Sequence, residues 1–164
     1  MIPTTGTASS AKFLHRRQNP GPTSSGIAYH KFYRQNQLLF SEVADQSEYG
    51  SWYWATDNIA SLSHQSGSDI EVRSAFTSTG KLSNTEDTKF RPIQQSYPTF
   101  GFAVCLGAVT STPVHTLFTL GHAQEQAVQF NGAKGVGTLP SLWKSYYSTE
   151  LDAVRTFLVY LSHN

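Results

Sequence analysis

Hydrophobic and polar residues alternate along most of the chain from Ile27 onward, in short runs that Gly, Asn, Asp and Ser interrupt. Alternation with a period of two is typical of strands that bury one face. Several short strands separated by turn residues predict a mainly β fold, an antiparallel β-sandwich. The runs are IAYHKFY (27–33), LLFSEVA (38–44), SWYWAT (51–56), NIASLSH (58–64), DIEVRSAF (69–76), TFGFAVCLGAV (99–109) and HTLFTLGHAQEQAVQF (115–130).

Only the end of the chain predicts a helix, over residues 149–162. Thr149 can cap it, and Asp152 falls in its first turn. Its apolar residues form one stripe: Leu151, Val154, Phe157, Leu158 and Leu161. Residues 1–26 are instead rich in Thr, Ser, Gly and Pro, which predicts a flexible N-terminal arm. The predicted organisation is this arm followed by one β-sandwich domain with a C-terminal α-helix, residues 27–164.

The charge balance excludes some partners. Twelve basic residues face eleven acidic ones, a net charge of +1, so no basic field would hold a nucleic-acid backbone. No run approaches the ~20 apolar residues of a membrane span, and the first residues lack the apolar core of a secretory signal. We therefore expect an intracellular protein without nucleic-acid or membrane partners. A trimmed secreted precursor and a homo-oligomer stay open as alternatives.

Cys105 is the single cysteine, which excludes an intrachain disulfide and a thiolate metal cluster within one chain. Its apolar surroundings, FGFAVCLGAV, predict a buried and inert thiol.

An aromatic cluster lies in EYGSWYWATDN (48–58), where Tyr49, Trp52, Tyr53 and Trp54 fall within six positions of a chain that is 13% aromatic. Strand alternation places Trp52 and Trp54 on one face and Tyr53 on the other. These rings, together with Phe118, are candidate walls for a flat apolar ligand. The alternative is that they simply belong to the core.

Two of the six histidines each end an apolar strand face, Ala60-Leu62-His64 and Phe118-Leu120-His122. Both faces should point inward. The ordinary interpretation is a core histidine bonded to the backbone. The alternative is a metal site formed by His64 and His122, because neutral imidazole binds borderline metals well. Carboxylates near the aromatic cluster could complete it: Asp45, Glu48 and Asp57.

The sequence contains no Gly-x-Ser-x-Gly elbow, P-loop, His-Glu-x-x-His or dinucleotide fingerprint. Charged residues in the segment 66–91 could form an acid–base pair. Ion pairs that brace turns, Asp69–Arg73 and Asp87–Arg91, are the more ordinary interpretation.

The stretch FSEVADQSEYGSWYWAT, the run SGSDIEVRSAFTSTGKLSNTEDTKFRPI and the tail GHAQEQAVQF…SYYSTELDAVRTFL resemble the N-terminal β-sandwich region of fungal glutaminase A-type proteins. The resemblance covers about residues 27–162. In that family the sandwich precedes a large helical region thought to carry hydrolysis, which is absent from this sequence. The resemblance therefore implies the fold, and we expect a protein that is not an enzyme. No catalytic residue can be carried over.

A free-standing domain of this kind and length also resembles the pink-coloured chromoproteins of oyster mushrooms, which are glutaminase-like in sequence. That resemblance implies a non-enzymatic protein that binds a small conjugated, indolone-type pigment together with a metal ion. The alternative is an accessory or carbohydrate-binding module derived from a glutaminase, with exposed aromatic rings stacked on sugars.

Overall fold

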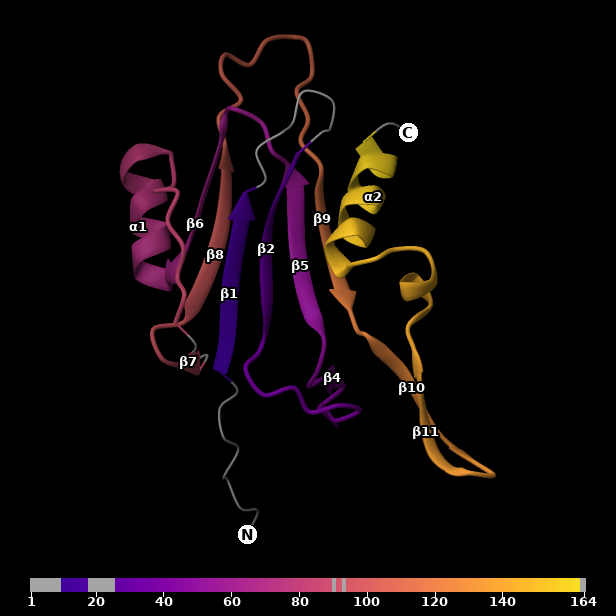
Figure 1. Cartoon of the computed structure of the whole chain (residues 1–164). Helices are drawn as coiled ribbons and strands as arrows, with labels where there is room; N and C mark the ends of the chain where they lie inside the picture. The colour runs from indigo at the N-terminus through magenta and orange to yellow at the C-terminus, as the bar shows by residue number, and fades with distance from the viewer. Residues whose placement is uncertain (1–9, 18–25, 90, 93, 163–164) are drawn as a thin grey trace.

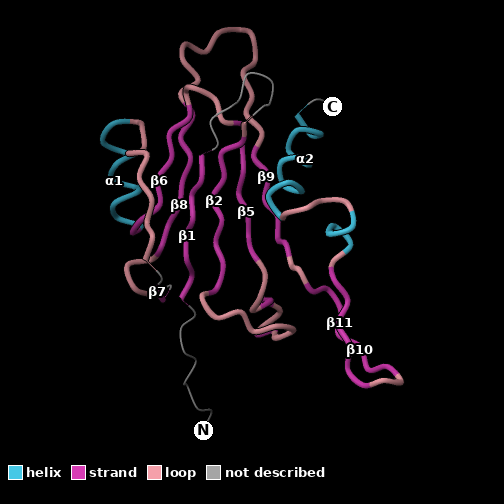
Figure 2. The backbone as a smooth tube through the Cα atoms, viewed as in Figure 1, coloured by secondary structure: helices cyan, strands magenta, loops and turns pink. Residues whose placement is uncertain are grey.

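The computed structural model describes residues 10–17, 26–89, 91–92 and 94–162. These residues form antiparallel sheets, two α-helices and a short 3-10 helix (Figures 1 and 2). The predictions of a mainly β fold and of a C-terminal helix are confirmed. No helix in these ranges is both long enough and apolar enough to cross a membrane.

The main sheet has five strands in the order β7-β1-β2-β5-β9. They are β7 (Arg91–Pro92), β1 (Ser10–Arg17), β2 (Ile27–Arg34), β5 (Ser51–Asp57) and β9 (Phe118–Ala123). A second sheet pairs β6 (Leu62–Ser68) with β8 (Pro98–Val104), and two hairpins stand apart from both sheets. The hairpins are β3 (Glu42–Val43) with β4 (Gln46–Ser47), and β10 (Gln126–Gly132) with β11 (Gly135–Pro140).

The two larger sheets meet through aromatic side chains. The ring of His30 on β2 lies 4.5 Å from that of Phe102 on β8, and Phe32 lies 5.1 Å from Phe100. His30 also bonds across the layers, with Nε2 3.0 Å from the carbonyl oxygen of Gly101. Flat rings in mutual contact between sheets are what the strand alternation predicts for a sandwich core.

A helix covers the outer face of each layer (Figure 1). Helix α1 (Asp69–Thr79) packs on the β6–β8 sheet through a small cluster made of Val72, Leu82 and Ala103. Helix α2 (Glu150–Ser162) packs on the main sheet, where the buried cluster consists of Ile27, Tyr29, Tyr53, Ala55 and Leu158. The core is therefore divided among the aromatic layer between the sheets and two helix–sheet interfaces.

Helix α2 begins as predicted. The backbone N–H of Asp152 donates to Thr149 Oγ1 over 3.1 Å, and the Thr149 hydroxyl donates to Asp152 Oδ2 over 2.8 Å. This pair satisfies a backbone donor of the first turn. Of the apolar stripe, Leu158 is buried and Phe157 is exposed.

Helix α1 corrects the expectation of a strand at 69–76. Ser68 and Glu71 form a capping box, with the Ser68 N–H donating to Glu71 Oε2 over 3.0 Å and the Glu71 N–H donating to Ser68 Oγ over 3.3 Å. Gly80, at φ 67°, ends the helix in the left-handed conformation that glycine adopts without strain. These end signals outweigh the alternation of DIEVRSAF. The Asp69–Arg73 ion pair is present within this helix.

The N-terminal segment differs in part from the predicted flexible arm. Residues Ser10–Arg17 form β1, which pairs with β2 on one side and β7 on the other. Without it the backbone groups along that side of β2 would lack ladder partners, which favours an added strand. The other residues of the predicted arm, 1–9 and 18–25, lie outside the described ranges.

Two predicted strands are shorter than expected. In 38–44 only the two residues of β3 are extended, because Phe40 and Ala44 have φ of 60° and 50° and turn the backbone there. The run 115–130 divides into β9 and β10.

The prediction for Cys105 is wrong, because its side chain is exposed. Strand β8 ends at Val104, so Cys105 lies just beyond the covered part of its apolar run.

Candidate functional site

The aromatic cluster is divided between the two faces of β5, as the alternation predicts. Trp52 pairs with His122 in the register and Trp54 pairs with Leu120, on the face toward the second sheet. Tyr53 lies on the opposite face, within the cluster that α2 covers. The predicted ligand-binding residues therefore belong to two surfaces rather than to one pocket.

On the first surface, Trp54 is enclosed by rings, with Phe102 at 5.0 Å and Phe118 at 5.6 Å. Trp52 is 37% exposed. It stacks nearly parallel to Phe32, at 6.0 Å and 5°, and to His122, at 4.3 Å and 11°. We call Phe32, Trp52 and His122 the ring stack. Trp52 lies between the other two rings, and the exposed end of the stack is the His122 ring at the sheet edge.

The expectation that Phe118, Leu120 and His122 point into the core is corrected. They share the face that carries Trp52 and Trp54, but all three side chains are exposed, and Leu120 is 68% exposed. The second sheet has two strands against five in the main sheet, so it does not cover the β9 edge.

The two predicted metal ligands lie in different sheets. His64 is buried on β6, opposite Phe102 in the register. His122 is exposed on β9, with Nε2 3.0 Å from the carbonyl oxygen of Tyr49. Glu48, a suggested third ligand, pairs with Arg34.

Within the described ranges, no group of three or more His, Cys, Asp or Glu residues could hold a metal. A protein zinc site takes three or four such ligands. These residues therefore do not fit a metal bound by this chain alone.

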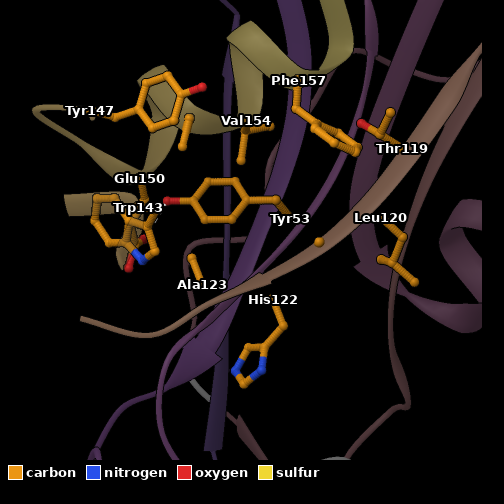
Figure 3. A pocket seen from close by; sticks show the side chains of 12 residues that line it. Tyr53, Thr119, Leu120, His122, Ala123, Trp143, Tyr147, Glu150, Val154 and Phe157 are labelled. Carbon is orange, nitrogen blue, oxygen red and sulfur yellow. Dashed lines mark hydrogen bonds between the residues drawn. The ribbon is translucent and has the colours of Figure 1, made fainter. Parts of the chain in front are cut away.

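On the other face, Tyr53 lies where two cavities adjoin, between the main sheet and the segment that contains α2 and the 3-10 helix η1 (Leu142–Ser145). Their volumes are about 430 Å³ and about 860 Å³. Both are lined by Tyr53, Trp143 and Glu150, and Figure 3 shows the smaller cavity with Phe157 on its wall. We call the two cavities together the Tyr53 groove.

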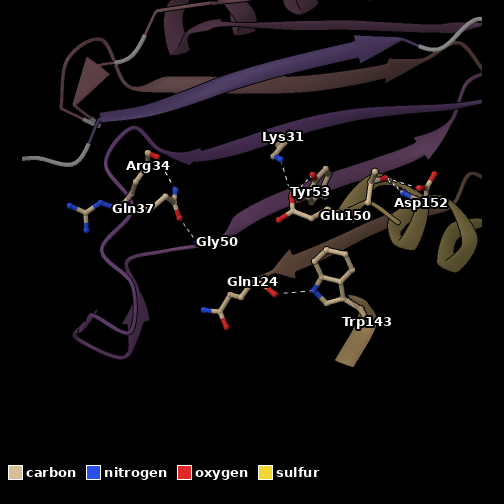
Figure 4. Close-up of polar contacts among 10 residues, drawn as sticks. Lys31, Arg34, Gln37, Gly50, Tyr53, Gln124, Trp143, Glu150 and Asp152 are labelled. Carbon is tan, nitrogen blue, oxygen red and sulfur yellow. Dashed lines mark hydrogen bonds and ion pairs between the residues drawn. The ribbon is translucent and has the colours of Figure 1, made fainter. Parts of the chain in front are cut away.

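Three side chains from distant segments meet in the groove (Figure 4). The Tyr53 hydroxyl donates to Glu150 Oε2 over 2.6 Å, and Lys31 Nζ donates to the same oxygen over 2.9 Å. The Lys31 ammonium also lies 5.2 Å from the centre of the Tyr53 ring. Burial, with the hydrogen bond to Glu150 second, raises the pKa of Tyr53 well above its usual range. The phenol therefore stays protonated and remains a donor.

This arrangement presents a fixed acceptor beside a fixed donor. The hydroxyl of Tyr53 and the ammonium of Lys31 both contact Glu150 Oε2, and the second carboxylate oxygen, Oε1, can accept from a ligand donor. An ammonium has three donors, so Lys31 can hold Glu150 and a ligand oxygen together. Hydrogen bonds to charged groups contribute about 1.5–3 kcal/mol each. The pair suits a group that both donates and accepts, such as a carboxamide.

A second ion pair, Lys144 Nζ to Glu125 Oε2 at 3.1 Å, lies on the wall of the larger cavity. Trp143 is oriented by its indole N–H, which donates to the carbonyl oxygen of Gln124 over 2.9 Å (Figure 4). Tyr49, one of the predicted ligand-binding residues, also lines this cavity.

Sequence reasoning missed Lys31, Trp143, Tyr147 and Glu150. Lys31 and Glu150 are 119 positions apart, and no motif joins them. Glu150 is an ordinary acidic residue in the first turn of a helix, where the helix dipole stabilises a negative charge. Only the packing of α2 on β2 and β5 reveals it.

A family model and two curated relatives match the chain. A family described as "Domain of unknown function (DUF5127)" matches residues 6–162. Glutaminase A of Aspergillus oryzae is 51% identical over 138 residues, which cover 84% of this chain and 20% of that protein. A protein described as "Probable glutaminase/05536", of Arthroderma benhamiae, is 30% identical over 122 residues, 70% of this chain and 14% of its own length. No solved structure matches.

The likeness to Glutaminase A confirms the predicted resemblance and contradicts our prediction that the chain is not an enzyme. At 51% identity the chain is homologous to part of an enzyme. The prediction relied on the absence of a helical region from this sequence, but the chain spans only a fifth or less of the curated relatives it matches. Neither relative's name mentions a pigment or a metal.

Proposed function

Since the chain belongs to the DUF5127 family, we propose that it forms part of a glutaminase-type amidohydrolase and that the Tyr53 groove binds the carboxamide of glutamine. The observation that carries the proposal is the Lys31–Glu150 pair, held by Tyr53 at a groove in a chain that is 51% identical to Glutaminase A.

The chemistry of the substrate matches the pair. A carboxamide oxygen accepts from the Lys31 ammonium while its N–H donates to Glu150 Oε1. Hydrolysis breaks the C–N bond, forms a C–O bond to water and releases ammonia. In the proposed complex, Lys31 draws electron density toward the carbonyl oxygen, and Tyr53 holds Glu150 in place.

A small amide tests the site directly. Propionamide, the side chain of glutamine cut at Cβ, is expected to shift the amide resonances of Lys31, Tyr53 and Glu150 in a ¹⁵N-labelled chain. Glu150→Gln and Lys31→Met should each weaken this binding by about tenfold, the loss of one charge-assisted hydrogen bond of about 1.4 kcal/mol. Asp69→Asn is the matched control, because it breaks an ion pair on α1, outside the groove. Equal binding by propionate, or unchanged binding by both groove variants, would refute the proposal.

A second candidate function is favoured by the ring stack. We propose that a small conjugated pigment lies against the exposed His122 end of the ring stack, beside Phe118 and Leu120, where a flat ring could continue the parallel stacking. A metal in this complex would need donors from the pigment or another chain, in addition to His122.

Protein purified from its natural source should then show a visible absorption band and bound metal. Trp52→Ala should remove the band, and His122→Ala should release the metal. Tyr53→Phe is the control, because Tyr53 lies on the other face of the sheet. A colourless natural protein, or colour that survives Trp52→Ala, would exclude pigment binding on the ring stack.

A further inference from the structure

The Tyr53 groove carries an inference about its ligand class that rests on the proposed function. We infer that the groove takes glutamine as a residue within a peptide, with its α-amino and α-carboxyl groups in amide bonds, in preference to free glutamine. The inference combines the charges of the lining residues, the extent of the groove and the rings along its walls.

The charges of the residues that line the groove favour a ligand without charged α-groups. Four Lys and Glu residues line the groove, and they form two ion pairs, Lys31–Glu150 and Lys144–Glu125. On the wall of the smaller cavity, His122 Nε2 contacts the Tyr49 carbonyl oxygen. Free glutamine carries an ammonium and a carboxylate, and both lose water on binding unless an opposite charge meets them. Since the lining charges already neutralise one another, a ligand without α-charges loses less solvation here.

The volume of the groove exceeds what a single amino acid fills. The larger cavity of about 860 Å³ adjoins one of about 430 Å³, and Tyr53, Trp143 and Glu150 lie on both. Pockets for drug-sized molecules span about 300–1,000 Å³, so one glutamine of ten heavy atoms leaves most of the groove empty. A glutamine side chain at Glu150 would have room for chain neighbours on both sides. The groove therefore fits an extended ligand better than a single amino acid.

Aromatic side chains line both cavities of the groove. The rings of Tyr49 and Trp143 line the larger cavity, and those of Tyr147 and Phe157 line the smaller one. Aromatic side chains at binding surfaces offer large, rigid contact areas to peptide planes and neighbouring side chains at a low entropic cost. Trp143 is already oriented by its bond to Gln124.

The test compares three ligands on the full chain by NMR titration: N-acetyl-glutamine N-methylamide, L-glutamine and propionamide. The blocked glutamine is expected to bind at least about tenfold more tightly than L-glutamine, a difference of about 1.4 kcal/mol. Trp143→Ala should weaken the blocked glutamine and leave propionamide unchanged, because only the larger ligand reaches that ring. Trp143→Phe, which keeps a ring, should retain most of the binding. It replaces the alanine variant in the test if that variant does not fold. Leu142→Ala, an exposed neighbour, is the matched control.

The outcomes separate the two proposals. L-Glutamine that binds as tightly as the blocked form overturns this inference while propionamide binding still supports the carboxamide site. Binding of none of the three overturns both. Displacement of the blocked glutamine by a neutral oligosaccharide at similar concentration would overturn the peptide assignment in favour of a carbohydrate site.

Discussion

Replacing Leu158 with alanine is expected to lower the free energy of unfolding by about 3 kcal/mol. Leu158 is 0% exposed and lies in the cluster with Ile27, Tyr29 and Tyr53 that joins α2 to the main sheet. The strands beneath it are fixed by their ladders, so the cavity left by the lost atoms can collapse only partly. Urea denaturation followed by circular dichroism measures the change, with the m-value as a check that the folded state is otherwise intact.

Leu161→Ala is the matched control on the same helix. Leu161 is 41% exposed, so its loss should cost under about 1 kcal/mol. Similar losses for the two variants would mean that α2 does not pack on the sheet through Leu158. Because α2 also carries Glu150, that result would remove the structural basis of the Tyr53 groove.

The elements that the sequence predicts well are those with local signals. The final helix has a capping residue, an acidic first turn and an apolar stripe, and β2 and β5 show clear alternation. Helix α1 was missed although its capping box, Ser68 with Glu71, and its terminal Gly80 are visible in the sequence. Over so short a segment alternation and end signals compete, and here the end signals decide the structure.

The Tyr53 groove could not be predicted, because its residues meet only through tertiary packing. Lys31 points toward Glu150 because its side chain projects from β2 to the face of the main sheet that α2 covers, and no spacing between positions 119 apart encodes that. The parity of β5 was predictable, so the separation of Trp52 from Tyr53 was too. Exposure was not. The inward face expected for Leu120 depends on how many strands the opposite sheet has, which alternation does not report.

The two faces of β5 separate Trp52 from Tyr53, although His122, at the sheet edge, belongs to the ring stack and also lines the smaller cavity. Trp52 and Tyr53 are neighbours in sequence, yet their side chains project to opposite faces. A change at Trp52 should therefore leave carboxamide binding intact, and a change at Glu150 should leave pigment binding intact. Additive effects are therefore the expectation for a double variant at Trp52 and Glu150.

Acidification is expected to destabilise the chain through His30. This side chain is 0% exposed, and burial, as the largest cause, lowers its pKa from 6.5 to about 4, with a smaller contribution from nearby His64. The unfolded chain therefore binds a proton between pH 6.5 and 4 that the folded chain does not. Stability is full above pH 6.5 and falls as the pH drops toward 4, by about 3 kcal/mol from this group. Urea titrations at intervals between pH 7 and 4 measure the loss.

A variant that cannot titrate isolates the cause. In His30→Gln the amide can still donate to the Gly101 carbonyl oxygen, as the imidazole does, but it takes up no proton. The variant should be less stable at pH 7, because glutamine packs poorly against Trp54 and Phe102, and its stability should decline less on acidification. His122→Gln, at an exposed position, is the control and should keep the wild-type slope. A slope that persists unchanged in His30→Gln would show that the buried imidazole of His30 is not the source of the acid sensitivity.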